Sequence, residues 1–262
     1  MKIIHISDLH FGTQRPNVVK TLLSSIEDIG ADLIIVSGDL TQRALREEFV
    51  EARAFLDALN VPFLSVPGNH DIPAYNVFSR FFTPYKQYQE HISDDLCPVF
   101  QNNEALIVGV NTARRAVPHW NWANGAISTA QCKEIERVFT ENPPAHWNIC
   151  VMHHPLCFDV AKSPLKVTVF GRDKALKTLA QTGVDIVLTG HTHHAGINLQ
   201  QSGVVPGDKI LHVGASTALS SRVREQNNGF NLIELAGQDL RILTFSHDDN
   251  EFRVVDSFEI TK

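Results

Sequence analysis

The residues Ile3-Ile4-His5-Ile6-Ser7-Asp8-Leu9-His10 place an acidic and an imidazole side chain directly after a short apolar run. Such a run is typical of a buried parallel strand. Four later runs have the same character and also end in polar residues: Leu33 to Val36, Phe63 to Val66, Ile149 to Met152 and Ile186 to Leu188. Because ligand sites in open α/β sheets assemble at the carboxyl ends of strands, we expect these polar ends to converge.

The polar segments offer carboxylate, imidazole and amide groups that could hold two divalent ions. They are Asp8 with His10, Asp39 after Gly38, Asn69 with His70 and Asp71, His153 with His154, and His191 with His193. Oxygen and nitrogen donors without a thiolate favour Mn, Fe or Zn over a structural cysteine site. Taken singly, each residue also has a structural interpretation, such as a turn cap or a satisfied core histidine. Five such segments, each at a strand end, predict a binuclear metal site.

The bulk properties predict one soluble domain over residues 1–262. No linker, repeat or low-complexity stretch divides the chain, and a boundary between residues 8 and 193 would split the expected site. No segment reaches the roughly 20 apolar residues that cross a bilayer, so we expect a cytoplasmic protein. The cysteines lack CxxC spacing and are interpreted as reduced: Cys97, Cys132, Cys150 and Cys157.

The net charge of −6 argues against an extended nucleic-acid surface. A small phosphate ester could still bind where metal ions supply the positive charge.

Helical patterns separate the expected strands. Val19 to Ile29 and Leu45 to Leu59 repeat apolar residues at helical spacing, and Ser128 with Gln131 predicts a capped helix start. Tyr75 to Ile92 is expected to be helical, either as a cap over the site or as ordinary packing. Four runs with alternating apolar residues predict an antiparallel meander: Ile210 to Val213, Phe230 to Leu235, Leu240 to Phe245 and Phe252 to Ile260. The expected architecture is two sheets face to face with helices outside.

The polar segments together resemble the signature of the calcineurin-like metallophosphoesterases. The resemblance rests on Asp8-Leu9-His10, Gly38-Asp39, Gly68-Asn69-His70-Asp71, His153-His154-Pro155 and Gly190-His191-Thr192-His193. It implies an α/β fold, a four-layer αββα sandwich of two mixed sheets, and hydrolysis of a phosphoric ester by a water that bridges two metal ions.

The resemblance also implies a role for each residue. Asp8, His10 and His193 would hold one ion, Asn69, His153 and His191 the other, and Asp39 would lie between them. His153 is preferred to His154 because the family's ligand stands two residues before the proline. His70 resembles the family's catalytic histidine, a general acid, and Asp71 would orient it.

Among subfamilies, the chain most resembles the bacterial class III cyclic nucleotide phosphodiesterases, through Asn111-Thr112 with the following loop and through Gly214 to Thr217 with Arg222 and Arg224. This implies a small phosphodiester substrate such as 3',5'-cAMP and leaves a homodimer open. Arg114, Arg115 and His119 either line the substrate mouth or are solvated loop residues. Alternatives are a phosphomonoesterase, a nuclease, or a metal-holding interaction scaffold without catalysis.

Overall fold

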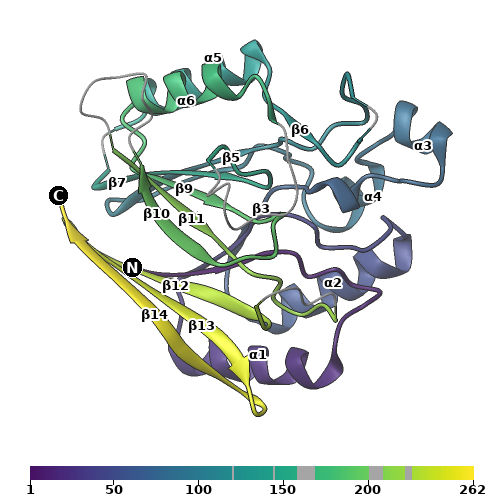
Figure 1. The fold of residues 1–262 in the computed structure, drawn as a ribbon, viewed down its shortest axis with the longest axis horizontal. Coiled ribbons are helices and arrows are strands. Elements are labelled where there is room, and N and C mark those ends of the chain that lie inside the picture. The colour runs from purple at the N-terminus through teal and green to yellow at the C-terminus, as the bar shows by residue number, and fades with distance from the viewer. Residues whose placement is uncertain (120, 144, 158–168, 201–208, 222–225) are drawn as a thin grey trace.

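Two six-stranded sheets pack face to face in the computed structural model, which describes residues 1–119, 121–143, 145–157, 169–200, 209–221 and 226–262. The first sheet has the strand order β14-β13-β12-β1-β2-β3 and the second β10-β11-β9-β7-β5-β4 (Figure 1). A two-stranded ribbon pairs β6 with β8. The strands are β1 (Lys2–Ile6), β2 (Leu33–Val36), β3 (Phe63–Ser65), β4 (Val99–Gln101), β5 (Ala105–Val110), β6 (Gly125–Ala126), β7 (Trp147–Met152), β8 (Val169–Phe170), β9 (Ile186–Thr189), β10 (Gly196–Gln200), β11 (Ile210–Gly214), β12 (Gly229–Ala236), β13 (Asp239–Asp248) and β14 (Glu251–Thr261).

Helices cover the outer face of each sheet. In Figure 1, α5 and α6 lie above the second sheet, and α1 and α2 lie below the first. The helices are α1 (Pro16–Ile29), α2 (Arg46–Ala58), α3 (Val77–Phe82), α4 (Lys86–His91), α5 (Thr129–Glu141) and α6 (Arg172–Gln181), with a 3₁₀ turn, η1, at Asn69–Asp71. The four-layer αββα sandwich expected from the sequence is therefore confirmed.

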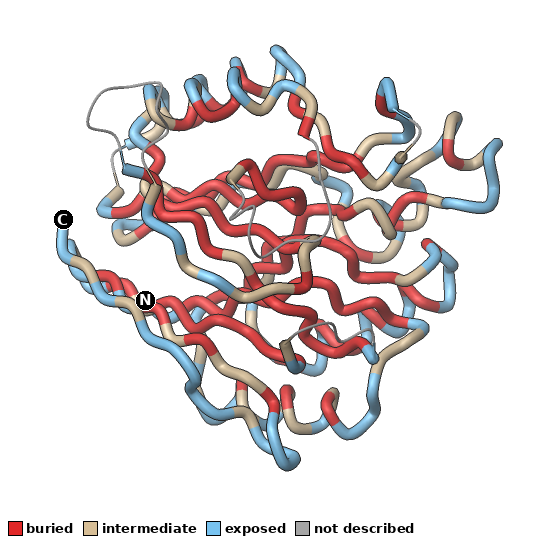
Figure 2. The backbone as a smooth tube through the Cα atoms, in the orientation of Figure 1, coloured by how far each residue is buried: buried red, intermediate tan, exposed pale blue. Residues whose placement is uncertain are grey.

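The alternation of side chains along the strands explains the layers. In β1, Ile3 joins the core between the two sheets, whereas Ile4 joins the core beneath α1 and α2. In β7, Ile149 faces the first sheet and Cys150 faces α5 and α6. Figure 2 shows the central strands of both sheets as buried, so these strands are covered on both faces.

The five strands predicted from apolar runs all form and pair in parallel within their sheets. Gly30 ends α1 in a left-handed conformation, and Ser128 caps α5 by accepting a hydrogen bond from the Gln131 amide. The segment from Tyr75 to Ile92 is helical in two short pieces, α3 and α4, because Pro84 lies between them.

One strand assignment from the sequence was wrong. Ile210 to Val213 was placed in the antiparallel meander, but β11 lies in the second sheet, parallel to β9 and antiparallel to β10. Only β12, β13 and β14 form the meander. A period of two identifies a strand but not its partner. The short and mostly exposed strand β10 was not predicted.

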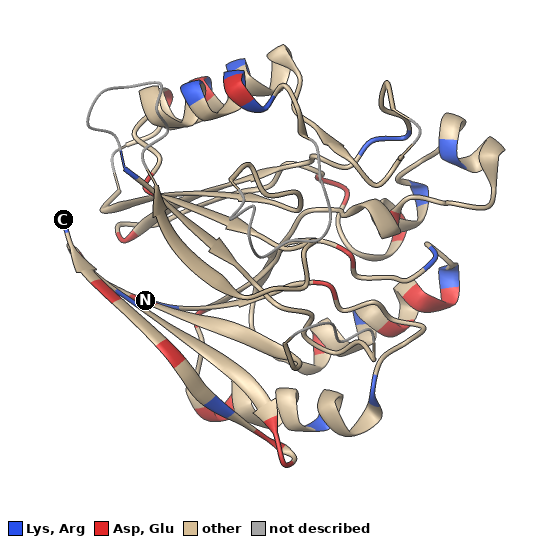
Figure 3. Ribbon diagram, in the orientation of Figure 1, with Lys and Arg blue, Asp and Glu red and all other residues tan. Residues whose placement is uncertain are grey.

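No helix in the described ranges is long and apolar enough to cross a membrane. Figure 3 shows Lys and Arg interleaved with Asp and Glu on α2 and α5 rather than gathered on one stripe. The four cysteines are free thiols.

Candidate metal centre

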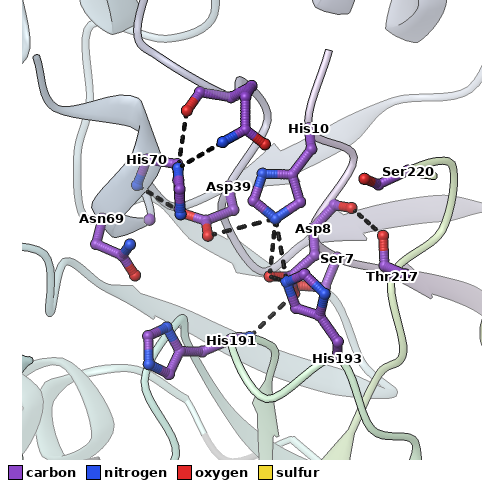
Figure 4. A network of polar contacts seen from close by, with 12 residues as sticks. Ser7, Asp8, His10, Asp39, Asn69, His70, His191, His193, Thr217 and Ser220 are labelled. Carbon is purple, nitrogen blue, oxygen red and sulfur yellow. Dashed lines mark hydrogen bonds and ion pairs between the residues drawn. The ribbon is translucent and has the colours of Figure 1, made fainter. Parts of the chain in front are cut away.

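The seven predicted ligands meet where the carboxyl ends of both sheets come together. The first sheet supplies Asp8 and His10 after β1, Asp39 after β2 and Asn69 after β3. The second sheet supplies His153 after β7, and His191 and His193 after β9. Figure 4 labels six of the seven, with His70 beside them. The site therefore spans the boundary between the two sheets.

The backbone at this centre is unusual. Asp8, His10, Asp39, His191 and His193 have φ values of 52°, 48°, 54°, 70° and 57°, in the left-handed region that non-glycine residues rarely adopt. Strain of this kind clusters at functional sites, where the surrounding structure enforces it. Asp8 and His10 both belong to the first set of donors described below, whereas the His-x-His pair is divided, with His193 in that set and His191 in the other.

Asp8, His10 and His193 form the first set of donors. His193 Nε2 lies 3.1 Å from both Asp8 Oδ1 and His10 Nε2, and His10 Nε2 lies 3.6 Å from Asp8 Oδ1. All three side chains are buried.

Asn69, His153 and His191 form the second set. His153 Nε2 lies 3.2 Å from Asn69 Oδ1 and 3.2 Å from His191 Nδ1. Asp39 Oδ2 lies 3.3 Å from His153 Nε2 and 3.8 Å from His10 Nε2, so the carboxylate stands between the two sets. Asn69 and His191 are partly exposed, which makes this set the more open one.

Backbone carbonyls orient the imidazole rings. His153 Nδ1 lies 2.8 Å from the Ser37 carbonyl oxygen, and His10 Nδ1 lies 3.3 Å from that of Thr41. An Nδ1–H that donates to a carbonyl leaves the lone pair of Nε2 facing the centre. These contacts could not be predicted from the sequence, because every residue has a backbone carbonyl group.

Asp8 is held by neighbours that the sequence reasoning also missed. Asp8 Oδ2 accepts hydrogen bonds from the Ser7 hydroxyl at 2.6 Å and the His191 amide at 2.9 Å. The Thr217 hydroxyl donates to the Asp8 carbonyl oxygen at 2.6 Å. Asp8 Oδ1 is left buried without a hydrogen-bond donor and faces the two histidines.

The donor set fits divalent metal ions. A zinc ion binds imidazole nitrogen at about 2.0–2.1 Å, so two ligands of one ion lie about 2.9–3.4 Å apart. Five of the donor separations, 3.1 to 3.3 Å, agree with this spacing, and the 3.6 Å between His10 Nε2 and Asp8 Oδ1 lies slightly beyond it. The orphaned Asp8 Oδ1 is an oxygen that a cation would satisfy.

His70 lies at the rim of the centre and is partly exposed. Its Nδ1 lies 2.8 Å from the Gln42 carbonyl oxygen, its amide donates to Asp39 Oδ1 at 2.8 Å, and its ring centroid lies 4.8 Å from that of His10. The Nδ1–H therefore donates to Gln42 and leaves Nε2 as the reactive nitrogen.

Asp71 acts on the backbone rather than on the ring of His70. Its buried carboxylate accepts hydrogen bonds from the amides of Leu40, Thr41 and Gly68, at 3.2, 2.9 and 2.8 Å. Burial, with the charge of Asp39, raises the pKa of Asp71 to about 6. The orienting contact predicted for Asp71 is made to the His70 ring by Gln42 instead.

The electrostatics favour an anionic pair of carboxylates. Burial opposes ionisation of Asp8, but His193, His10 and His153 outweigh it and hold the pKa of Asp8 well below its usual value. Burial also disfavours a charged His153, yet the Asp39 carboxylate raises the pKa of His153 to about 9. Burial, with the charge of His153, lowers the pKa of His191 to about 3. A proton on His153 therefore competes with any cation.

The other residues predicted near the substrate lie in the loop after β5. The Arg114 guanidinium donates to Gln131 and to the Ala113 carbonyl, that of Arg115 donates to the Phe81 carbonyl, and His119 Nδ1 accepts from the Asn121 amide. None of these contacts reaches the seven predicted ligands. Arg222 and Arg224 lie outside the described residues.

A family model described as "Calcineurin-like phosphoesterase" matches residues 1–195. The chain belongs to this family. As a calcineurin-like phosphoesterase it is a metal-dependent phosphoric ester hydrolase, and the aspartate and histidine clusters agree with that chemistry.

Two curated proteins illustrate which phosphoesterases are similar. A probable glycerophosphodiester phosphodiesterase GpdQ from Arcobacter nitrofigilis is 23% identical over 217 residues, covering 78% of this phosphoesterase and 76% of the relative. A probable cyclic nucleotide phosphodiesterase from Vesicomyosocius okutanii is 27% identical over 93 residues, covering 30% and 40% of the two chains.

Among solved structures, the purple acid phosphatase PPD1 from yellow lupin matches with a TM-score of 0.77 at 16% identity. The match covers 100% of this phosphoesterase and 53% of the lupin chain, so the chain spans about half the length of that phosphatase. The likeness shows a shared fold.

Proposed function

We propose that the protein is a phosphodiesterase that hydrolyses a cyclic nucleotide, such as 3',5'-cAMP, or another small phosphodiester. The observation that carries the proposal is the convergence of all seven predicted ligands with His70 at their open side. The two curated relatives described as phosphodiesterases support the choice of a diester.

We assign the ligands by their contacts. Asp8, His10 and His193 would hold the first ion, Asn69, His153 and His191 would hold the second, and Asp39 would contribute to both. The mixed oxygen and nitrogen donors favour Mn, Fe or Zn. Two such ions, when bound, supply Lewis-acid charge for the phosphoryl oxygens and lower the pKa of a water molecule that becomes the nucleophile.

His70 is the proposed general acid. The Gln42 carbonyl fixes its Nδ1–H, so a proton on Nε2 faces the open side of the site. The phosphate enters beside the partly exposed Asn69, His70 and His191. His70 Nε2 then donates its proton to the leaving oxygen as the ester bond breaks. The Asp71 carboxylate keeps the turn at Leu40 and Thr41 in register with η1.

The alternatives predict different outcomes of one assay. A phosphomonoesterase prefers a monoester, a nuclease prefers an oligonucleotide, and a scaffold turns over neither. A scaffold needs neither an intact His70 nor a complete donor set, and both are present here. A cytoplasmic location and a homodimer stay predictions.

The test is hydrolysis of bis-p-nitrophenyl phosphate beside p-nitrophenyl phosphate by metal-stripped protein to which Mn²⁺ is restored. We expect preference for the diester and at least a tenfold loss of turnover in His70→Asn, with two ions still bound per chain. The exposed His146→Asn is the matched control. Preference for the monoester, or full turnover in His70→Asn, would contradict the proposal.

A further inference from the structure

His154 lies among the candidate ligands, yet both of its ring nitrogens are already engaged. The Thr112 hydroxyl lies 3.2 Å from the His154 amide nitrogen and 2.8 Å from Nδ1. A hydroxyl has one hydrogen, so it accepts from the amide and donates to Nδ1. Nε2 then carries the ring hydrogen and donates to the Ala123 carbonyl oxygen at 2.9 Å.

This pattern separates His154 from the ligands. Donor nitrogens of His153, His154 and His191 lie within 4.8 Å of one another, which on its own would suggest a three-histidine site. Binding an ion through His154 would break its bond to Thr112 or to Ala123. The geometry therefore gives this buried imidazole a different task.

The ring of His154 packs directly on the ligand shell. Its centroid lies 4.6 Å from that of His191 and 4.9 Å from that of His153. On another side it meets Gly125, where an added Cβ would lie 2.6 Å from His154 Cγ. The imidazole is thus clamped between two proposed ligands and the end of the loop that follows Thr112.

The loop, residues 114–124 apart from residue 120, has a second anchor. The buried Arg80 of α3 donates to the carbonyl oxygens of Arg114 and Arg115, at 3.3 and 2.7 Å, and lies 4.9 Å from the ring centroid of Trp122. Arg80 therefore holds the start of the loop and contacts Trp122, and His154 holds the neighbouring Ala123. Only one imidazole separates the Ala123 carbonyl from the ring of His191.

We propose that His154 is a positioning residue that couples the loop to the ion held by His191, so that the loop forms the substrate-side wall of the site. Coupling between two sites is reciprocal. Loosening the loop therefore weakens binding of that ion, and loss of the ion loosens the wall. The part concerning substrate rests on the proposed phosphodiesterase activity, whereas the part concerning the metal does not.

The experiment compares His154→Phe, which keeps a planar ring but removes both side-chain hydrogen bonds, with His154→Gln, whose amide can still donate to the Ala123 carbonyl. Calorimetric titration of metal-stripped protein with Mn²⁺ should show two ions per chain in both. We expect the Kd of the ion held by His191 to rise at least fivefold in His154→Phe and to stay within twofold of wild type in His154→Gln. Removing a group that orients a metal ligand typically lowers metal affinity by about 10- to 100-fold.

Steady-state kinetics with bis-p-nitrophenyl phosphate supply the second readout. His154→Phe should raise KM at least fivefold with kcat within threefold of wild type, and His154→Gln should restore KM. Thr112→Val and Thr112→Ser form a second pair that leaves the imidazole in place, and it decides the matter where His154→Phe does not fold. Like His154→Phe, the valine variant should raise both the Mn²⁺ Kd and KM, and the serine variant should leave both unchanged.

Three results would overturn the proposal. Loss of one ion in His154→Phe would make His154 a ligand. Equal defects in His154→Gln and His154→Phe would remove the contact with Ala123 from the explanation. Unchanged Mn²⁺ Kd in Thr112→Val would show that the loop and the ion are independent. If wild type lacks turnover, the proposed function fails, and the Mn²⁺ titrations alone decide the coupling.

Discussion

Returning Mn²⁺ to metal-stripped protein at several pH values probes the contact between His153 and Asp39. The Ser37 carbonyl occupies the Nδ1 hydrogen of His153, and Asp39 Oδ2 lies 3.3 Å from Nε2. Burial disfavours the charged ring, but the Asp39 carboxylate raises the pKa of His153 to about 9. At neutral pH a proton therefore occupies the nitrogen that has to bind the ion.

The magnitude follows from the pKa. Below pH 9, binding of the second ion releases one proton, so its affinity falls about tenfold for each pH unit. Between pH 8 and pH 6 the loss is about 100-fold, or about 2.7 kcal/mol. The stability of the metal-stripped fold depends on pH in the opposite direction. The raised pKa of His153 stabilises it fully below pH 6.5, and this contribution is lost as pH rises through about 9.

Isothermal titration calorimetry in two buffers of different ionisation enthalpy measures the released proton directly. We expect the release of about one proton when the second ion binds at pH 7. Asp39→Asn is the control: it should bind metal more weakly at every pH, but with a flatter pH dependence, because His153 loses the carboxylate that holds its proton. Equal affinity at pH 6 and pH 8, or no proton release, would refute the reasoning.

Three further predictions concern stability. Burial lowers the pKa of His5 to about 3, so unfolding takes up a proton as pH falls below 6.5. Urea titrations should show wild type losing about 2 kcal/mol more than His5→Gln between pH 7.5 and pH 5, and equal losses would contradict this. Arg80→Met should lower stability by about 3 kcal/mol, because three carbonyl oxygens lose a charged donor, and an unchanged urea midpoint would argue against that role. Asp249 and Asn250 turn the β13–β14 hairpin with φ values of 44° and 67°. Asn250→Gly should therefore raise stability by about 0.5 kcal/mol, and a lower melting temperature would disprove it.

The positions of the candidate ligands could be predicted because parallel strands end at a common edge. Asp8, Asp39 and Asn69 each follow an apolar run, and the rule that links such runs to one edge needs no knowledge of loops. The strand runs of the second sheet are equally plain, so His153 and His191 were found in the same way. The division of these strands between two sheets that meet across the site was not predicted.

Contacts through the main chain could not be predicted. The orientation of His70 depends on the Gln42 carbonyl, and the carboxylate of Asp71 binds backbone amides, neither of which leaves a sequence pattern. The strand at Ile210 to Val213 was predicted correctly as a strand, but its pairing with β9 and β10 in the second sheet leaves no pattern in the sequence. The contacts of Arg114 and Arg115 depend on loop geometry, which composition does not fix.

Because the donors come from both sheets, neither half of the molecule carries a complete set by itself. An arriving cation therefore meets its full coordination only after β1, β2 and β3 have docked against β7 and β9. We therefore expect the ions to bind at the end of folding and to bind tightly only when the two sheets are correctly docked, since a chain with misplaced sheets would hold its ions poorly. By mass action the bound ions then resist separation of the sheets, and chelation should first loosen the seam between them rather than either sheet.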